Sequence, residues 1–204
     1  MNTVEPTVEQ RAFRPTTLDL GDAVLRPWGP STTVRGGAAA GMLAAAADPD
    51  IAMWSPIRAT DQAGAEAFLD RLAAGWESGN SAPFAIVGAG DDELLGTVGL
   101  RWVDRADGLA MIGYWLLPAG RGRGLATRAT RAVTTWGIAE SWVRRVEIAH
   151  AVGNEASCRV AERCGYPAEG TLRASHRFGD GKYHAEHLHA RLAEDPEPAD
   201  LPGE

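Results

Sequence analysis

The sequence predicts an α/β fold in which helices flank a mostly antiparallel central sheet, and three observations lead to this prediction. The apolar residues repeat with a helical period as far as Trp76 and then alternate with a period of two up to Leu117. The alternating stretch ends in a glycine-rich turn, which a second helical pattern follows. The chain has 204 residues, of which 45% are hydrophobic, so it can form one domain with its own core.

The first part of the chain is expected to form one strand and two helices. Residues 17–27 carry spaced apolar residues around a Gly-Asp turn, which indicates an interrupted strand. The alanine-rich residues 36–47 favour a helix, which the Asp-Pro pair at Asp48 should end, with Trp54 in the loop that follows. Asp61 can begin the next helix, because apolar residues then recur at helical spacing: Ala65, Phe68, Leu69, Leu72 and Trp76.

Three strands should follow as an antiparallel meander. Residues 83–87, 94–103 and 109–117 are rich in β-forming residues, and the polar, glycine-containing segments between them are typical of hairpin connections. A long helix at about residues 124–143 then carries one apolar face, formed by Leu125, Ala129, Ala132, Val133, Trp136 and Ala139.

The last part of the chain adds three strands and one helix. A short strand is expected at residues 146–151, and the next helix begins at Asn154 and ends at Gly165. Two strands at about residues 170–178 and 182–192 complete the pattern. The prediction is therefore a sheet of about seven strands with about four helices.

Composition and charge limit the organisation and the partners of the chain. We expect one domain at residues 17–192, between a disordered tail at 1–16 and an acidic, proline-rich tail at 193–204. The net charge of −7 lies largely in the second tail, so nucleic acid, which requires clustered positive charge, is not an expected partner. Without a basic leader or an apolar run of ~20 residues, we expect no membrane partner and a cytoplasmic location. Cys158 and Cys164 should be reduced packing residues, because they lie on poorly matched faces of one helix.

Segment 111–126 carries the strongest functional signal. An apolar strand runs into a glycine- and arginine-rich turn and then into a helix, which brings free backbone N–H groups and the positive end of the helix dipole together. Such a point can bind phosphate, and its candidate residues are Arg121, Gly122, Arg123 and Gly124. The phosphate-loop motifs of nucleotide triphosphatases and of dinucleotide-binding proteins do not match this segment. A plain tight turn before a helix is the alternative.

Several motifs occur in the order and spacing of a known family. They are Gly-Tyr-Trp at 113–115, Arg-Gly-Arg-Gly-Leu-Ala at 121–126, Asn-Glu-Ala-Ser at 154–157 and Glu-Arg-Cys-Gly-Tyr at 162–166. Over residues 17–192 this pattern resembles the RimJ/RimL branch of the GNAT N-acetyltransferases. The resemblance implies a GNAT domain with a mixed sheet that opens into a V-shaped splay. It also implies that acetyl-CoA donates an acetyl group to a primary amine by direct attack on the thioester.

The resemblance further implies which residues hold acetyl-CoA. The pantetheine arm would pair with the end of the strand, where the N–H of Leu117 or Leu116 would polarise the thioester carbonyl. The pyrophosphate would lie beside Arg121 on the turn and helix start, formed by Gly122, Arg123, Gly124, Leu125, Ala126 and Thr127. Asn154 is either a plain helix cap or also a contact to the pantetheine. Arg163 either contacts the adenosine 3′-phosphate or belongs to a solvated helix face.

Ser157 and His176 are the candidates for proton transfer. Many GNAT members have a tyrosine seven residues after the asparagine, where this chain has Ala161. The RimL-like branch instead has a serine three residues after the asparagine, so Ser157 is the candidate proton donor to the departing thiolate. An ordinary serine that satisfies a helix N–H is the alternative. Some relatives have a glutamate nineteen residues after that serine. His176 occupies this position as a candidate base, with a water-relayed base or a packing histidine as alternatives.

The acceptor is expected to be a protein N-terminus or a small amine such as an antibiotic or an aminoacyl compound. Trp28 and Trp54 belong to variable entrance loops of this fold and could form the wall of the acceptor pocket. No metal is expected: His187 and His189 share one strand face, His184 points to the other, and no acid or cysteine completes a regular ligand set.

Two further questions stay open from the sequence. The chain could act as a monomer or as a homodimer. A non-catalytic module that binds acyl-CoA as a sensor is the alternative to an enzyme, because Ala161 and Ala185 stand where the family has polar residues.

Overall fold

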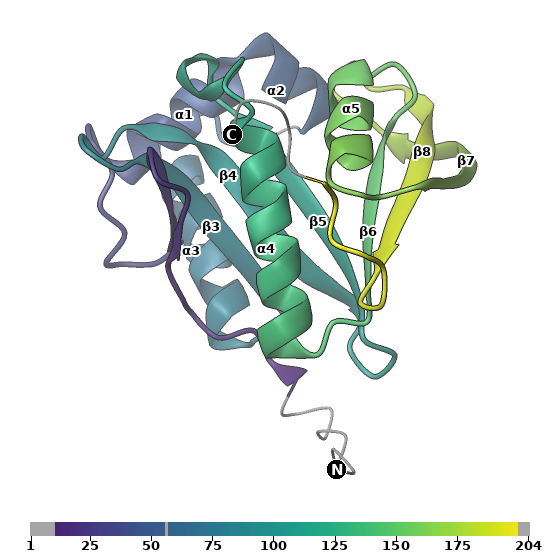
Figure 1. The fold of residues 1–204 in the computed structure, drawn as a ribbon. Helices are drawn as coiled ribbons and strands as arrows, with labels where there is room; N and C mark the ends of the chain where they lie inside the picture. The colour runs from purple at the N-terminus through teal and green to yellow at the C-terminus, as the bar shows by residue number, and fades with distance from the viewer. Residues whose placement is uncertain (1–10, 56, 200–204) are drawn as a thin grey trace.

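The computed structural model describes residues 11–55 and 57–199, which form one eight-stranded sheet with helices on both faces (Figure 1). The strand order is β1-β2-β3-β4-β5-β6-β8-β7, and every neighbouring pair is antiparallel except β5 and β6. The strands are β1 Leu18–Asp19, β2 Ala23–Pro27, β3 Ser81–Gly88, β4 Leu94–Asp104, β5 Leu109–Leu116, β6 Arg145–Ala151, β7 Ala168–Arg177 and β8 Tyr183–Leu192. The predicted mixed, mostly antiparallel sheet is confirmed.

The helices form two layers around this sheet. They are α1 Ala38–Ala47, α2 Pro49–Trp54, α3 Gln62–Glu77, α4 Leu125–Ser141 and α5 Glu155–Arg163. Figure 1 shows α4 in front of the sheet and α3 behind it. Because successive strand residues point to opposite faces, Ile86 packs in the cluster that contains Val133 of α4. Val87 packs in the other cluster, with Met42 of α1 and Ala65 of α3.

Helix α2 is an element that the sequence did not predict. Asp48 ends α1, as expected, but the same residue also begins α2. Its carboxylate accepts hydrogen bonds from the N–H groups of Asp50 at 3.1 Å and Ile51 at 3.0 Å, and Pro49 occupies the first helical position. Trp54 is therefore the last residue of a helix and not part of a loop.

Parts of both predicted tails contact the domain within the described residues. Phe13 is buried and stacks on Trp102, with 4.6 Å between the ring centroids. At the other end, Arg191 forms an ion pair with Glu197 at 3.0 Å, and the Arg131 guanidinium donates to the Ala199 carbonyl at 2.9 Å. Residues 11–16 and 193–199 thus pack on the domain, whereas residues 1–10 and 200–204 lie outside the described part.

An opening lies between β5 and β6, the parallel pair of the sheet. The two strands pair only from Leu109 to Met111 of β5, and Met111 is matched with Glu147 of β6. In Figure 1 the strands meet at the bottom of the view and diverge toward the top. The edge of β5 that faces β6 is therefore left without a neighbouring strand up to Leu116, which confirms the expected splay.

Among residues 11–55 and 57–199, no helix combines the length and the apolar character that a bilayer crossing requires.

Candidate active site

The free edge of β5 presents alternate backbone groups to the opening. The N–H of Leu117 donates to the carbonyl of Leu95 on β4 at 2.9 Å, so this amide is already used within the sheet. In an antiparallel pair, the residues between the hydrogen-bonded pairs point their N–H and C=O groups to the other side. Leu116, which is matched with Gly96, and Tyr114 therefore face the opening. The N–H of Leu117 is therefore not free for the predicted role, and Leu116 is the member of the predicted pair whose amide faces the opening.

The turn after β5 has the backbone conformation of an anion site. Gly122 and Gly124 have φ values of 73° and 67°, in the left-handed region that other residues adopt only at a cost of roughly 1–2 kcal/mol. Gly124 is the N-cap of α4 and makes no side-chain capping hydrogen bond. The amides of the first helical turn, from Leu125 to Thr127, therefore have no capping side chain and are directed out of the helix start.

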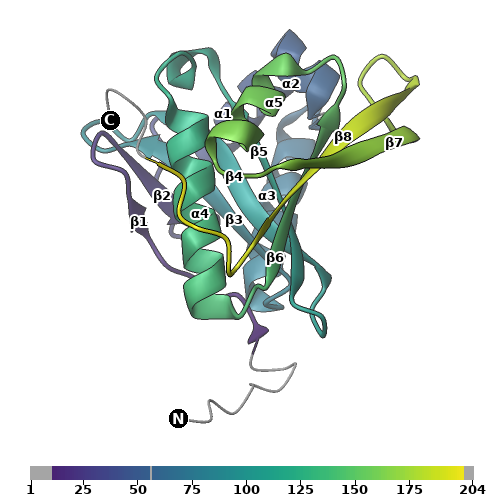
Figure 2. The ribbon, with the colours of Figure 1, turned by 45° about the vertical axis from the view of Figure 1, so that its right-hand side comes forward.

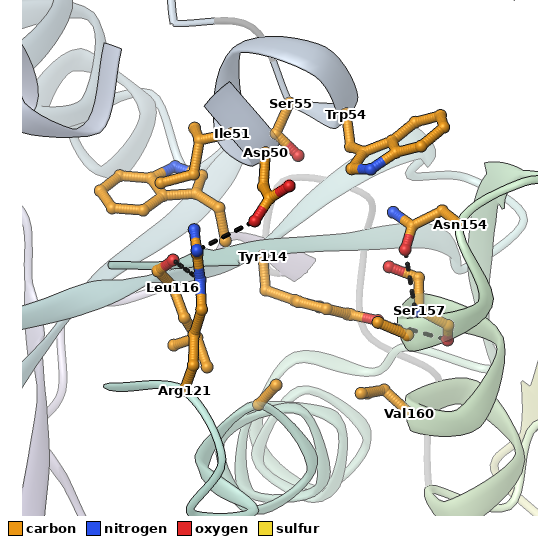
Figure 3. A pocket seen from close by; sticks show the side chains of 13 residues that line it. Asp50, Ile51, Trp54, Ser55, Tyr114, Leu116, Arg121, Asn154, Ser157 and Val160 are labelled. Carbon is orange, nitrogen blue, oxygen red and sulfur yellow. Dashed lines mark hydrogen bonds and ion pairs between the residues drawn. The ribbon is translucent and has the colours of Figure 1, made fainter. Parts of the chain in front are cut away.

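The two arginines of this turn are held by carboxylates. Arg121 pairs with Asp48 at 2.6 Å and with Asp50 at 3.0 Å, and its Nε donates to the Leu116 carbonyl at 3.0 Å (Figure 3). Burial would raise the pKa of Asp48, but hydrogen bonds from Ile51 N–H and from Arg121 outweigh burial and hold this pKa below its usual value. Through these ion pairs Arg121 links the turn to α2, in addition to any contact with phosphate.

Arg123 is also paired, with a carboxylate between β1 and β2. It contacts Asp22 at 2.5 Å, and Arg128 of α4 contacts the same carboxylate at 2.7 Å. Hydrogen bonds from Arg128 and then from Arg123 lower the pKa of Asp22 to about 2. Because of these pairs, the backbone amides and not the arginines are the uncommitted donors at the start of α4.

A cavity of about 320 Å³ lies between β5 and the start of α5. Tyr114, Leu116, Arg121, Asn154 and Ser157 are among its lining residues. Asn154 caps α5 as predicted, since its side chain accepts from the Ser157 N–H at 3.1 Å, and it also lines the cavity. Figure 3 shows the side chains of Asn154 and Ser157 beside each other at one end and Arg121 at the other.

Tyr114 is a cavity residue that the sequence reasoning missed. Its hydroxyl group lies 3.5 Å from the Ser157 carbonyl oxygen, on the face of β5 that points toward α5. Burial raises the pKa of Tyr114, so the phenol stays protonated at neutral pH and can donate a hydrogen bond. Its position in the alternating strand, two residues before Leu116, was a signal that could have identified it.

A second cavity, of about 460 Å³, continues from the first toward β6, β7 and β8. The two cavities share Trp54, Ser55, Tyr114, Asn154 and Ser157. His176 lines the second cavity, with its ring edge-on to Phe178 at 4.9 Å between centroids. The structure thus brings His176 to the same pair of cavities as Ser157.

The strand around His176 does not alternate regularly. A bulge between Leu172 and His176 contains Ala174 at a φ of 47°, so Ala174 does not continue a simple alternating face. Leu172 and His176 nevertheless both line the second cavity, together with two carboxylates that the sequence reasoning missed, Glu147 and Glu186.

The second cavity is covered where α2 meets the β7–β8 turn. The Gly179 N–H donates to the Met53 carbonyl at 2.9 Å, and the rings of Trp54 and Phe178 make an edge contact at 5.9 Å. Trp54 thus lines both cavities. Trp28 does not: it is 2% exposed, and its Nε1 donates to Thr97 Oγ1 at 3.1 Å within the core.

The remaining predicted residues lie away from the two cavities. Arg163 is exposed on α5, and its carbonyl accepts a hydrogen bond from Arg131 at 2.6 Å.

Both cysteines are free thiols, as expected. The expectation that no cysteine joins the histidines is wrong, because one ligand atom each of His150, Cys158, His187 and His189 lies within 4.8 Å of the others.

These features can hold an extended ligand. The open strand edge can pair with an amide-containing chain, the start of α4 can bind a diphosphate, and the joined cavities can bring a second molecule to the end of that chain. Figure 2 shows α5 beside the β7–β8 hairpin, which lies at one edge of the sheet, whereas β1 lies at the other edge.

Comparisons with known proteins agree with this geometry. A model of the acetyltransferase (GNAT) domain matches residues 24–167. "Probable N-acetyltransferase YjcK" of Bacillus subtilis (strain 168) is 40% identical over 91 residues, which are 44% of this chain and 50% of that protein. The ribosomal-protein-serine acetyltransferase of Escherichia coli (strain K12) is 31% identical over 102 residues, 50% of this chain and 56% of that protein.

Among solved structures, Mycobacterium smegmatis RimJ in complex with CoA-disulfide has a TM-score of 0.75 and 25% identity, and the match covers 88% of each chain. In sequence, the chain spans about half the length of the curated relatives it matches.

Proposed function

The chain belongs to the GNAT acetyltransferase family, and from this premise we propose that it transfers the acetyl group of acetyl-CoA to a primary amine. The observation that carries the proposal is the opening between β5 and β6, which joins a free strand edge to the uncapped start of α4 and to two connected cavities. The first cavity receives the acetyl donor and the second receives the amine.

Coenzyme A is the ligand that fits the first half of this arrangement. Its pantetheine amides pair with the backbone of Tyr114 and Leu116, and its diphosphate accepts hydrogen bonds from the amides between Gly122 and Thr127. The open space around Gly122 and Gly124, where an added Cβ would meet nothing within 4 Å, leaves room for close approach. The complex of RimJ with CoA-disulfide supports this choice of ligand.

The chemistry is a direct attack of the neutral amine on the thioester. The N–H of Leu116 is the donor for the oxyanion, and such a donor typically contributes a factor of roughly 10²–10³ in kcat. The Ser157 hydroxyl, which faces the first cavity, gives its proton to the departing thiolate and takes up the proton that the attacking nitrogen loses as the amide forms. Tyr114, a protonated phenol in the same cavity, is a second hydrogen-bond donor beside it.

The amine reaches the cavity as an ammonium group and must lose a proton before it attacks. His176 lines the cavity that receives the amine and is the base in this proposal. Glu147 is paired with Arg145 at 2.9 Å, so Glu186 is the carboxylate of this cavity that favours a positively charged acceptor over a neutral alcohol. The name of the Escherichia coli relative supports a ribosomal protein as one acceptor, within the class of protein amines, and small-molecule amines are the other class.

The test is release of free thiol from acetyl-CoA in the presence of a panel of amines. The panel combines peptides with free N-termini and small primary amines, and each is paired with its N-acetylated form as a matched control. The proposal expects thiol release with at least one free amine and none with its acetylated control. Saturable binding of acetyl-CoA without thiol release from any amine would instead indicate a non-catalytic binding module.

A further inference from the structure

Three histidines from two strands and one cysteine from a helix meet beside the second cavity. His150 of β6 is matched directly with His187 of β8, and Ile148 of β6 is matched with His189. Paired residues of antiparallel strands point to the same face, so all three imidazoles lie on one face of the sheet. Cys158 of α5 completes the group, and one potential ligand atom from each of the four side chains lies within 4.8 Å of all the others.

The hydrogen bonds of two of these histidines fix which ring nitrogens carry protons. His150 Nδ1 lies 2.9 Å from the Ala151 carbonyl oxygen, and His189 Nδ1 lies 3.0 Å from the Tyr166 carbonyl oxygen. A carbonyl oxygen only accepts, so each Nδ1 carries the proton and each Nε2 has a free lone pair. This arrangement, with Nδ1 held by a carbonyl and Nε2 free, is how metal-ligating histidines are usually oriented.

The two free lone pairs face each other. His150 Nε2 and His189 Nε2 are 3.2 Å apart, and the two residues are only 5% and 1% exposed. Two lone pairs at this distance repel unless a proton or a cation lies between them. A metal cation bound by both nitrogens removes this repulsion.

The size and chemistry of the cluster indicate which cation it takes. Zn–N bonds of about 2.0–2.1 Å in a tetrahedron place two ligand nitrogens about 3.3 Å apart, close to the observed 3.2 Å. Imidazole nitrogens and a thiolate are the ligands of zinc and related transition metals, whereas magnesium and calcium require oxygen ligands. His187 and Cys158 are only half-buried, so an ion can enter from their side.

We propose that His150, Cys158, His187 and His189 form a tetrahedral binding site for one Zn²⁺ ion. On binding, the Cys158 thiol releases its proton to solvent, and its sulfur and three imidazole nitrogens bond to the metal. The ion takes no part in acetyl transfer. It links α5 to β6 and β8, and α5 carries Asn154 and Ser157 at its start, so the ion holds these residues in place against the sheet.

The test titrates the full chain, stripped of metal by a chelator, with Zn²⁺ in competition with a chromophoric chelator. Co²⁺ then replaces Zn²⁺ as a spectroscopic probe. We expect one Zn²⁺ per chain, intense d–d bands of tetrahedral Co²⁺ and a thiolate-to-cobalt charge-transfer band. Cys158→Ser should remove the charge-transfer band and weaken Zn²⁺ binding at least 10-fold, and His187→Gln should weaken Zn²⁺ binding by a similar factor.

His184→Gln is the matched control, because His184 belongs to the same hairpin but pairs with Asp180 at 2.9 Å, outside the cluster. It should bind Zn²⁺ as the parent does. Circular dichroism of the metal-free variants checks that they are folded. The proposal is overturned if the parent binds Zn²⁺ no more tightly than Cys158→Ser and His187→Gln, or if its Co²⁺ form lacks the charge-transfer band. None of these readouts depends on acetyl transfer.

Discussion

Replacing Gly179 by alanine should loosen the cover of the acceptor cavity. A Cβ at Gly179 would collide with the Ala52 carbonyl oxygen and would lie 2.8 Å from the Met53 Cα, so backbone atoms of α2 are in the way. Neither atom belongs to a flexible side chain that could turn aside. The hairpin must therefore move away from α2, which breaks the hydrogen bond from Gly179 to Met53 and separates Trp54 from Phe178.

The expected change in the KM for the amine follows from the loss of these two contacts. The hydrogen bond contributes about 0.5–1.5 kcal/mol and the aromatic contact about 0.5–1.5 kcal/mol, so the closed form loses roughly 1–3 kcal/mol. Since 1.4 kcal/mol is a factor of ten, the KM for the amine should rise by roughly 5- to 150-fold if the covered cavity is the form that binds it. The KM for acetyl-CoA should change much less, because the diphosphate site at Gly122 to Thr127 lies on other elements.

The assay is thiol release at varied amine and, separately, at varied acetyl-CoA. Gly170→Ala is the matched control: it lies in the same hairpin, and a Cβ there would meet nothing within 4 Å. Urea unfolding checks that both variants are folded. If Gly179→Ala keeps the amine KM of the parent and of Gly170→Ala, the contact between α2 and the hairpin does not cover the acceptor site.

Three other substitutions probe the chemistry and the anion turn. Ser157→Ala should lower kcat at least about 100-fold with little change in acetyl-CoA affinity, which single-turnover kinetics would measure; an unchanged kcat removes the serine from the mechanism. His176→Gln should abolish the acid limb of the pH–rate profile, and an unaltered profile would exclude this base. Asp22→Asn should lower the free energy of unfolding at pH 7 by at most about 1 kcal/mol, because the half-exposed carboxylate pairs with Arg128 and Arg123 in solvent. Because the pKa of Asp22 is lowered to about 2, this difference should persist above pH 4 and disappear as the pH falls through 2 in urea titrations; a difference that survives at pH 1 would contradict it.

The sheet and the anion turn could be predicted from local patterns. Alternation over β3, β4 and β5 and the polar connections between them are short-range signals, and the meander that they predicted is present. The glycines before α4 are also local, since a left-handed backbone at Gly122 and Gly124 depends on the turn itself.

The donor amide could not be chosen in the same way. Alternation shows which residues of β5 direct their backbone N–H and C=O groups to the same edge of the strand. Only the register against β4 shows which of the two edges is already hydrogen-bonded within the sheet. The hydrogen bond from Leu117 to Leu95 leaves Leu116 as the member of the pair whose N–H faces the opening, and nothing near Leu117 in the sequence signals this bond. Helix α2 was missed for a different reason: Asp48 followed by Pro49 is a stop signal for one helix and an equally good start signal for the next.

Features that depend on contacts between distant elements were also missed. Phe13 is a single aromatic residue in a polar stretch, and only the place of Trp102 in the sheet explains its burial. The group of His150, Cys158, His187 and His189 requires the pairing of β6 with β8 and the position of α5 above them. Spacing along one strand, which is all that the sequence provides, showed only that His187 and His189 share a face.

Amide hydrogen exchange along β5, measured by NMR with and without CoA, tests whether the free edge of β5 binds the donor. The Leu117 N–H is bonded to β4, so its exchange should be slow in both samples. The N–H groups of Tyr114 and Leu116 face the opening, and we expect CoA to slow their exchange and that of the amides between Gly122 and Thr127. Unchanged exchange at Tyr114 and Leu116 at saturating CoA would contradict this expectation.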